Sequence, residues 1–157
     1  MSNNYKESFD QIKIPGSLAA EALDEVTSYV KPGVTTAKLD KICYEFIRDN
    51  GGHSAPLYYR GFPKSSCTSV NHVVCHGIPA DKYLKEGDIV NIDVTSIVNG
   101  WHGDTSRMFF VGEVSVKSKK LVSATYNSMM KAISIIKSGI YLGDIGEAIQ
   151  AYVEEKG

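Results

Sequence analysis

The sequence has 157 residues, of which 43% are hydrophobic and 22% are charged, a composition typical of one globular domain. Seventeen Lys and Arg residues balance 18 Asp and Glu residues, giving a formal net charge of -1. This balance argues against a protein devoted to nucleic-acid binding, which needs surplus basic residues. The apolar runs are far shorter than the about 20 residues that cross a bilayer, so no membrane partner is expected.

The N-terminal stretch MSNNYKESFD lacks both an apolar signal-peptide core and an Arg-rich transit pattern. Three cysteines, Cys43, Cys67 and Cys75, form no Cys-x-x-Cys pair, and their odd number leaves one thiol unpaired in any disulfide scheme. We therefore expect reduced thiols and a cytoplasmic protein.

Two amphipathic helices are expected in the first third of the chain. Apolar residues recur with the helical period over residues 16–30, and Lys-Pro-Gly at 31–33 ends that segment. Thr35 or Thr36 is placed to cap a second helix, which ends at Asn-Gly-Gly, residues 50–52.

The middle of the chain is expected to form strands and loops. Residues 53–78 show no helical period and are rich in Ser, Tyr, Gly and Pro. Asn-Gly at 99–100 separates two β-rich runs, residues 89–98 and 101–111, a strong hairpin signal. The helical period then returns in two segments, residues 122–136 and 145–153. The sequence thus predicts a single α+β domain over residues 1–157, with helices on one face of an antiparallel sheet.

The expected hairpin brings two carboxylates together. A two-residue turn pairs Thr95 with Asp104 and Asp93 with Ser106. Asp93 and Asp104 then share one face as diagonal neighbours, whose backbones lie ~7–8 Å apart. Arg107 is expected on the opposite face. The two carboxylates therefore have few cationic neighbours.

Three interpretations of Asp93 and Asp104 remain open at this point. Converging carboxylates need neutralisation, either by a shared proton or by a metal ion. Oxygen ligands suit Mg, Mn, Fe or Zn, but two carboxylates alone bind weakly and require further ligands. Alternatively, both side chains are solvent-exposed and merely tolerated in the strands, although Asp is disfavoured there.

Four histidines need separate interpretation. His76 precedes Gly77 and Pro79 and is placed to face a cleft, where it would donate a hydrogen bond or move a proton, although a lone histidine is more often structural. We expect His53 in a loop, His72 on the surface, and His102 exposed beside the hairpin turn as a minor metal-ligand candidate.

Cysteines and aromatic residues in the middle of the chain have two interpretations. Cys67 and Cys75 are expected to be small buried hydrophobic residues. Tyr58, Tyr59 and Phe62 fit either the core or the wall of an apolar pocket.

Four segments carry a specific family resemblance. They are residues 61–71 (GFPKSSCTSVN), 73–79 (VVCHGIP), 87–95 (GDIVNIDVT) and 103–106 (GDTS). With these segments the chain resembles type I methionine aminopeptidase over essentially its whole length. The resemblance implies the first half of a pita-bread fold. It also implies removal of the initiator methionine from nascent chains whose second residue is small.

The resemblance implies roles for six residues. Asp93 matches a bidentate ligand of one metal, and Asp104 matches a carboxylate that bridges two divalent ions, which are Co, Mn, Fe or Zn in the family. His76 matches a catalytic residue that contacts substrate and stabilises the transition state or handles the leaving-group proton. The residues that match the lining of the methionine pocket are Tyr59, Phe62 and Cys67.

The sequence also departs from the family pattern. Phe62 stands where the family often has Tyr, and Pro56 where it often has Cys. The family continues into a second half that supplies a metal-binding His, a second catalytic His and two metal-binding Glu residues, and no segment here matches them. We therefore expect the chain alone to have weak or no activity.

The resemblance implies nascent polypeptide N-termini as the substrate, with association with ribosomes, and a family that is typically monomeric. The alternative function is a non-catalytic truncated paralogue that acts as a binding protein or self-associates, because a lone half-fold would expose an apolar edge or face. A third alternative is another pita-bread hydrolase such as a prolidase. The Cys-His-Gly-Ile-Pro sequence at 75–79 and the lack of a large preceding domain count against that alternative.

Overall fold

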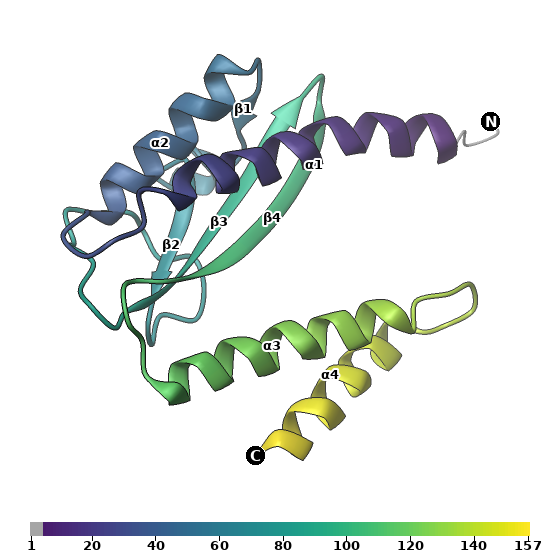
Figure 1. Ribbon diagram of the computed structural model, residues 1–157. Helices are drawn as coiled ribbons and strands as arrows, with labels where there is room; N and C mark the ends of the chain where they lie inside the picture. The colour runs from purple at the N-terminus through teal and green to yellow at the C-terminus, as the bar shows by residue number, and fades with distance from the viewer. Residues whose placement is uncertain (1–4) are drawn as a thin grey trace. The chain divides into compact units, whose positions relative to one another are not determined.

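The computed structural model describes residues 5–157, which divide into two compact units, one ending at Val114 and one spanning Ser115–Gly157. Each unit is described by itself, and the expected single domain stays a prediction. The first unit contains α1 (Tyr5–Thr27), α2 (Thr36–Asp49), β1 (His53–Ser54), the 3-10 turn η1 (Tyr59–Gly61), β2 (Ser66–Val70), β3 (Ile89–Val98) and β4 (Trp101–Phe110) (Figure 1). The second contains α3 (Val116–Ser134) and α4 (Leu142–Lys156).

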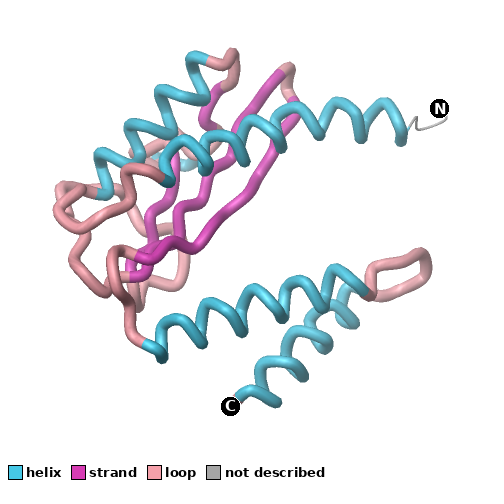
Figure 2. The backbone as a smooth tube through the Cα atoms, in the orientation of Figure 1, coloured by secondary structure: helices cyan, strands magenta, loops and turns pink. Residues whose placement is uncertain are grey.

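The sheet of the first unit is built around β3. This strand pairs antiparallel with β4 along one edge and with β1 and β2 along the other (Figure 2). Thr95 lies opposite Asp104 and Asp93 opposite Ser106, which confirms the expected register. Asn99 and Gly100 form the turn with φ angles of 52° and 81°, as a two-residue turn with two left-handed residues requires.

Helices α1 and α2 cover one face of this sheet. Val90, Ile92 and Val94 alternate along β3 on that face, are fully buried, and form one core cluster with apolar residues of both helices. Arg107 lies on the same side, where its guanidinium contacts the carboxylate of Asp24 on α1 at 2.8 Å. The expected α+β arrangement, with helices on one face of an antiparallel sheet, is confirmed for this unit.

Helix α1 begins well before the expected segment and includes Pro15 in its interior. Proline is disfavoured inside helices because it lacks a backbone N–H and its ring crowds the preceding turn. In the structure the carbonyl of Pro15 accepts a hydrogen bond from Ser96 Oγ at 2.8 Å. Gly16 and Pro15 also lie against Gly103 of β4 so closely that a Cβ at Gly103 would collide with their backbone. Tertiary packing therefore holds a helix that the local sequence disfavours.

Helix α2 fixes the start of β2. Thr35 caps the helix through Oγ1, which accepts from the backbone N–H of Lys38 at 3.2 Å, as expected. The buried Asp40 accepts hydrogen bonds at Oδ1 from the backbone N–H and the hydroxyl of both Ser65 and Ser66, at 2.7–3.0 Å. Four donors to one buried carboxylate oxygen offset its desolvation. The next residue of β2 is Cys67.

The second unit is a pair of helices that pack against each other. Ser115 caps α3 by accepting from the N–H of Ser118 at 3.0 Å, and the carboxylate of Asp144 accepts from the N–H of Tyr141 at the start of α4. Both expected C-terminal helices are present, although α3 ends at Ser134, short of the expected boundary.

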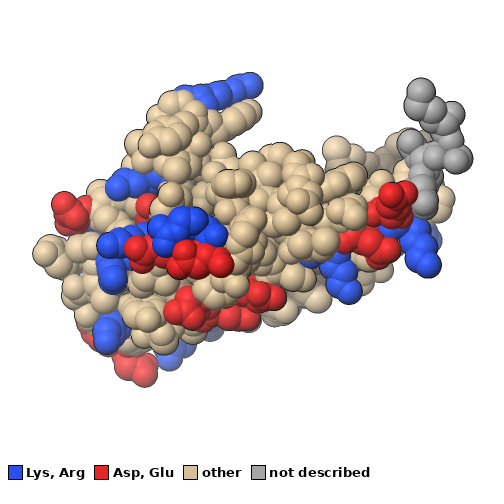
Figure 3. Space-filling view, turned by 90° about the horizontal axis from the view of Figure 1, so that it is seen from above, with Lys and Arg blue, Asp and Glu red and all other residues tan. Residues whose placement is uncertain are grey.

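Charges of both signs are interspersed on the face seen in Figure 3, where basic and acidic side chains lie beside one another. None of the helices in the described part of the chain is long and apolar enough to span a bilayer.

Candidate active site

A cavity of about 830 Å³ opens on the first unit and gathers residues from distant parts of its sequence. The hairpin β3–β4 and strand β2 supply one part of its wall, and the segments around residues 55–63 and 76–78 supply the rest. The lining residues from the hairpin and β2 are Cys67, Asp93, Thr95, His102 and Asp104. Because Asp93 and Thr95 alternate with the buried residues of β3, the cavity lies on the sheet face opposite α1 and α2.

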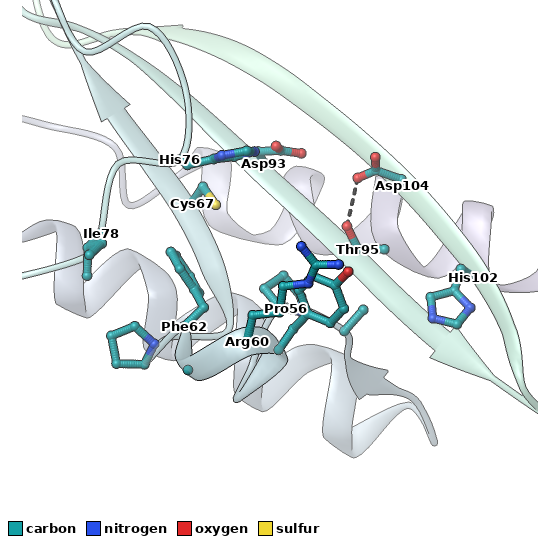
Figure 4. A pocket seen from close by; sticks show the side chains of 14 residues that line it. Pro56, Arg60, Phe62, Cys67, His76, Ile78, Asp93, Thr95, His102 and Asp104 are labelled. Atoms are coloured by element: carbon teal, nitrogen blue, oxygen red, sulfur yellow. Dashed lines mark hydrogen bonds between the residues drawn. The ribbon is translucent and has the colours of Figure 1, made fainter.

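Asp93 and Asp104 both project into this cavity, as the hairpin register predicted (Figure 4). Thr95, directly opposite Asp104, donates a hydrogen bond from Oγ1 to Asp104 Oδ1 at 2.8 Å. This bond orients the Asp104 carboxylate and leaves Oδ2 free of the threonine. The register already placed these two residues as a cross-strand pair, but the sequence did not indicate the hydrogen bond.

The pKa of the Asp93 carboxyl is raised above its ordinary value. Burial is the main cause, and the negative charge of Asp104 and a hydrogen bond with its carboxyl act in the same direction, while His76 partly offsets them. Two close carboxylates favour a shared proton or a bound cation over two free charges. The interpretation that both carboxylates are solvent-exposed is wrong for Asp93, which is half-buried, and holds for Asp104, which is exposed.

His76 reaches the cavity from a loop that is anchored on β2. The backbone N–H of Thr68 donates to the carbonyl of Gly77 at 2.8 Å, and the N–H of Gly77 donates to Ser69 Oγ at 3.2 Å. A Cβ at position 77 would collide with the Thr68 backbone, so glycine is required for this close approach. His76 itself has φ of 54°, an unusual value for a residue with a side chain. The imidazole lies beside Asp93 in Figure 4.

Apolar side chains complete the cavity. Tyr59, Phe62 and Cys67, which the resemblance assigned to a side-chain pocket, all line it, together with Pro56 and Ile78. Cys67 lies directly opposite Asp93 in the β2–β3 pairing, so the apolar wall adjoins the carboxylates. The structure thus brings all six residues implied by the resemblance into one cavity. Their roles in binding and catalysis remain predictions.

Three of the remaining sequence expectations need correction. Tyr58 is exposed and lies neither in the core nor in the wall of the cavity. Cys75 is exposed rather than buried, because it lies in the loop that reaches out from β2. His53 lies in β1 rather than in a loop, paired with Ile97. His102 is exposed beside the turn as expected and lines the cavity. It completes no metal cluster, since no group of three potential His, Cys, Asp or Glu ligands occurs within residues 5–157.

Comparison with known proteins decides the family. The profile of metallopeptidase family M24 matches residues 10–157, nearly the entire chain. The chain belongs to metallopeptidase family M24. A methionine aminopeptidase of Rickettsia prowazekii is 57% identical over 150 residues, which are 96% of this chain and 58% of that protein. The chain therefore spans a little over half the length of this relative.

Solved structures of M24 relatives share the fold. The crystal structure of methionine aminopeptidase from Rickettsia prowazekii superimposes with a TM-score of 0.95 at 56% identity, covering 96% of this chain and 61% of that one. A prolidase from Pyrococcus furiosus gives a TM-score of 0.84 at 19% identity, with 97% and 44% coverage. The pita-bread fold is thus confirmed, and the prolidase likeness concerns the fold alone.

The donors in the M24 cavity fit the type of metal ion that a metallopeptidase uses. Asp93 and Asp104 offer hard oxygen ligands, and the raised pKa of Asp93 shows an electrostatic demand that a cation would relieve. Two carboxylates leave most coordination positions of a divalent ion to other donors. The described residues therefore supply part of a ligand set.

The three thiols of this M24 chain should differ strongly in reactivity. Burial and the charge of Asp40 raise the pKa of Cys43 to about 12, and burial with the charge of Asp93 raises that of Cys67 to about 11. Cys75 is exposed. With Ellman's reagent at pH 8 we expect one fast thiol and two that react at least about 100-fold more slowly, because the thiolate is the reactive form. Cys75→Ser should remove the fast phase, and its persistence would contradict the assignment.

Proposed function

We propose that this chain forms the part of a methionine aminopeptidase that holds the methionine side chain and two carboxylate metal ligands. The proposed reaction removes the N-terminal methionine from nascent polypeptides with a small second residue, in the cytoplasm and at ribosomes. One observation carries the proposal. A single cavity joins the carboxylates of Asp93 and Asp104 to an apolar wall formed by Tyr59, Phe62 and Cys67.

This cavity suits both the side chain and the amino group of an N-terminal methionine. The flexible thioether side chain packs well against aromatic and sulfur-containing residues, which Tyr59, Phe62 and Cys67 provide. The peptide's N-terminal amine, in its neutral form, would be a nitrogen donor to a metal ion that Asp93 and Asp104 hold. His76, beside Asp93, is placed to donate a hydrogen bond to the peptide carbonyl or a proton to the leaving amine.

Asp93 and Asp104 would hold two divalent metal ions, Co, Mn, Fe or Zn, with further donors supplied by residues that this chain does not contain. Metal ions in such a site polarise the peptide carbonyl and lower the pKa of the attacking water. The hydrogen bond from Thr95 fixes the orientation of Asp104, a contribution that commonly affects metal affinity about 10- to 100-fold.

The test uses a chimera in which residues 1–157 are joined to the C-terminal part of the Rickettsia prowazekii enzyme that this chain does not cover. With Mn or Co added, the chimera should release methionine from Met-Ala-Ser. It should be at least about tenfold slower on Leu-Ala-Ser, because a pocket contact commonly discriminates by 1–3 kcal/mol. It should also discriminate against Met-Leu-Ser, whose second residue is large.

A chimera that folds and binds metal, yet cleaves all three peptides equally, would overturn the proposed substrate. Release of alanine and proline from the dipeptide Ala-Pro, without methionine release, would instead favour a prolidase-type activity.

The second candidate function is that of a non-catalytic protein that self-associates. The specific observation is β4, whose only strand partner among the described residues is β3, so its outer edge offers unpaired backbone groups. Sedimentation velocity of the 157-residue chain distinguishes the two. A concentration-dependent dimer without methionine release from the chimera would favour self-association, whereas a stable monomer would count against it.

A further inference from the structure

Arg60 is the only Lys or Arg among the described residues that line the cavity, and no sequence pattern indicated it. Its side chain is exposed and extends from η1 into the cavity, as Figure 4 shows. No carboxylate of residues 5–157 forms an ion pair with its guanidinium, whereas Arg48 and Arg107 pair with Asp49 and Asp24. The Arg60 guanidinium is thus available to a ligand.

The local backbone presents Arg60 in a defined position. Tyr58, Arg60 and Gly61 have φ angles of 68°, 49° and 83°, so three of four consecutive residues are left-handed. Hydrogen bonds from the N–H of Tyr58 to the carbonyl of Phe62, at 2.8 Å, and from the N–H of Phe62 to the carbonyl of Tyr59, at 2.9 Å, close this turn.

A ring contact restricts the Arg60 side chain as well. The guanidinium lies 5.4 Å from the centre of the Tyr59 ring, within cation–π range. Such stacking leaves the edge of the planar guanidinium free to donate two parallel hydrogen bonds to a carboxylate. A side chain that is already ordered loses less entropy when it binds.

Negative and positive side chains therefore lie in different parts of the cavity. Asp93 and Asp104 lie on the hairpin, and Arg60 lies on the separate turn η1. A peptide bound as proposed would place its N-terminal amino group near the carboxylates, with its following residues leading away from them. The complementary group for Arg60 is a carboxylate in that following part.

We infer that Arg60 is a specificity residue that binds a carboxylate carried by the peptide downstream of its N-terminal methionine. This inference rests on the proposed function, since the methionine places the peptide. The carboxylate has two sources, an acidic side chain at the third position or the C-terminus of a dipeptide.

The test measures binding to the 157-residue chain by NMR, following the Nε–H signal of Arg60 and the backbone signals of the cavity. One arm compares Met-Ala-Asp amide with its isosteric neutral partner Met-Ala-Asn amide. The other compares Met-Ala with a free C-terminus and Met-Ala amide. We expect about fivefold tighter binding of the acidic member in at least one arm, which is what a partly exposed ion pair supplies, and a weaker preference at high salt.

Variants test whether the Arg60 side chain causes the preference for the acidic peptides. Arg60→Gln should abolish it, and Arg60→Lys should retain part of it because the charge remains. Arg48→Gln is the matched control, since Arg48 stacks on Tyr44 at 5.7 Å in a similar way but lies outside the cavity. This control variant should keep the full preference.

Each outcome decides the inference. A preference only for Met-Ala-Asp amide identifies acidic polypeptides as the favoured substrates, and a preference only for free Met-Ala identifies dipeptides. Equal affinities in both arms, a preference that survives Arg60→Gln, or no binding of any of the four peptides would overturn it. The proposed function fails separately, if the chimera releases no methionine from the neutral peptide Met-Ala-Ser.

Discussion

Replacing Asp104 by asparagine should lower methionine release by the chimera at least about 100-fold, because the amide loses the negative charge that a divalent ion requires. Asp93→Asn should have a comparable effect. Both side chains line the cavity, and Thr95 holds Asp104 in place at 2.8 Å. The measurement is kcat/KM on Met-Ala-Ser, with metal content of the purified variants determined in parallel.

Asp81→Asn is the matched control for these variants, because Asp81 is an exposed carboxylate on a loop outside the cavity. It should leave kcat/KM unchanged. Full activity of either Asp93→Asn or Asp104→Asn would show that the carboxylates are not metal ligands.

The same Asp93→Asn variant should be more stable than the parent when no metal is present. Because the pKa of Asp93 is raised in the folded state, folding binds protons between the ordinary and the raised pKa. Stability therefore falls as pH rises through that window, and the penalty is complete above it. Urea unfolding of the metal-free 157-residue chain should show the gain at pH 7 and its decline as the pH is lowered. A gain that grows with acidification would contradict this sign.

Replacing Gly103 by alanine should lower the free energy of unfolding by about 3 kcal/mol or more, the upper range for overpacking a tight contact. The added Cβ would collide with the backbone of Pro15 and Gly16 in α1. These backbone atoms cannot move aside as the end of a flexible side chain can. Either α1 or β4 must move, and Asp104 immediately follows Gly103 in β4. Urea unfolding followed by circular dichroism measures the loss.

Gly16→Ala tests the same contact from the other side. A Cβ on Gly16 meets no atom within 4 Å, and the residue lies inside a helix. This variant should gain about 0.5–1 kcal/mol, as alanine does in helices. Equal losses for both variants would indicate general sensitivity of α1 rather than a collision at Gly103.

The hairpin shows how much of the candidate site could be predicted from the sequence. Asn99–Gly100 defines a two-residue turn, and the alternation of strand residues then determines which side chains share a face. Asp93 and Asp104 were therefore placed together without any structure. For His76, Tyr59 and Phe62 the residues alone left alternatives open, because their segments have no simple periodicity, and the resemblance chose between them.

Other features depend on tertiary contacts that local patterns do not encode. Helix α1 continues through Pro15 because Ser96 and Gly103 pack against it. Cys75 is exposed on the loop that follows β2, and hydrogen bonds between Gly77 and β2 determine where this loop returns to the sheet. Arg60 enters the cavity through left-handed backbone angles at a residue that is not glycine, which no propensity predicts.

Methionine release from Met-Ala-Ser, measured side by side for the 157-residue chain and for the chimera with Mn or Co added, tests the central claim most directly. The claim is that this chain supplies the methionine pocket and only part of the metal ligand set. We predict no measurable turnover by the chain alone and metal-dependent turnover by the chimera, lost in Asp104→Asn. Turnover by the bare chain at the rate of the chimera would contradict the claim.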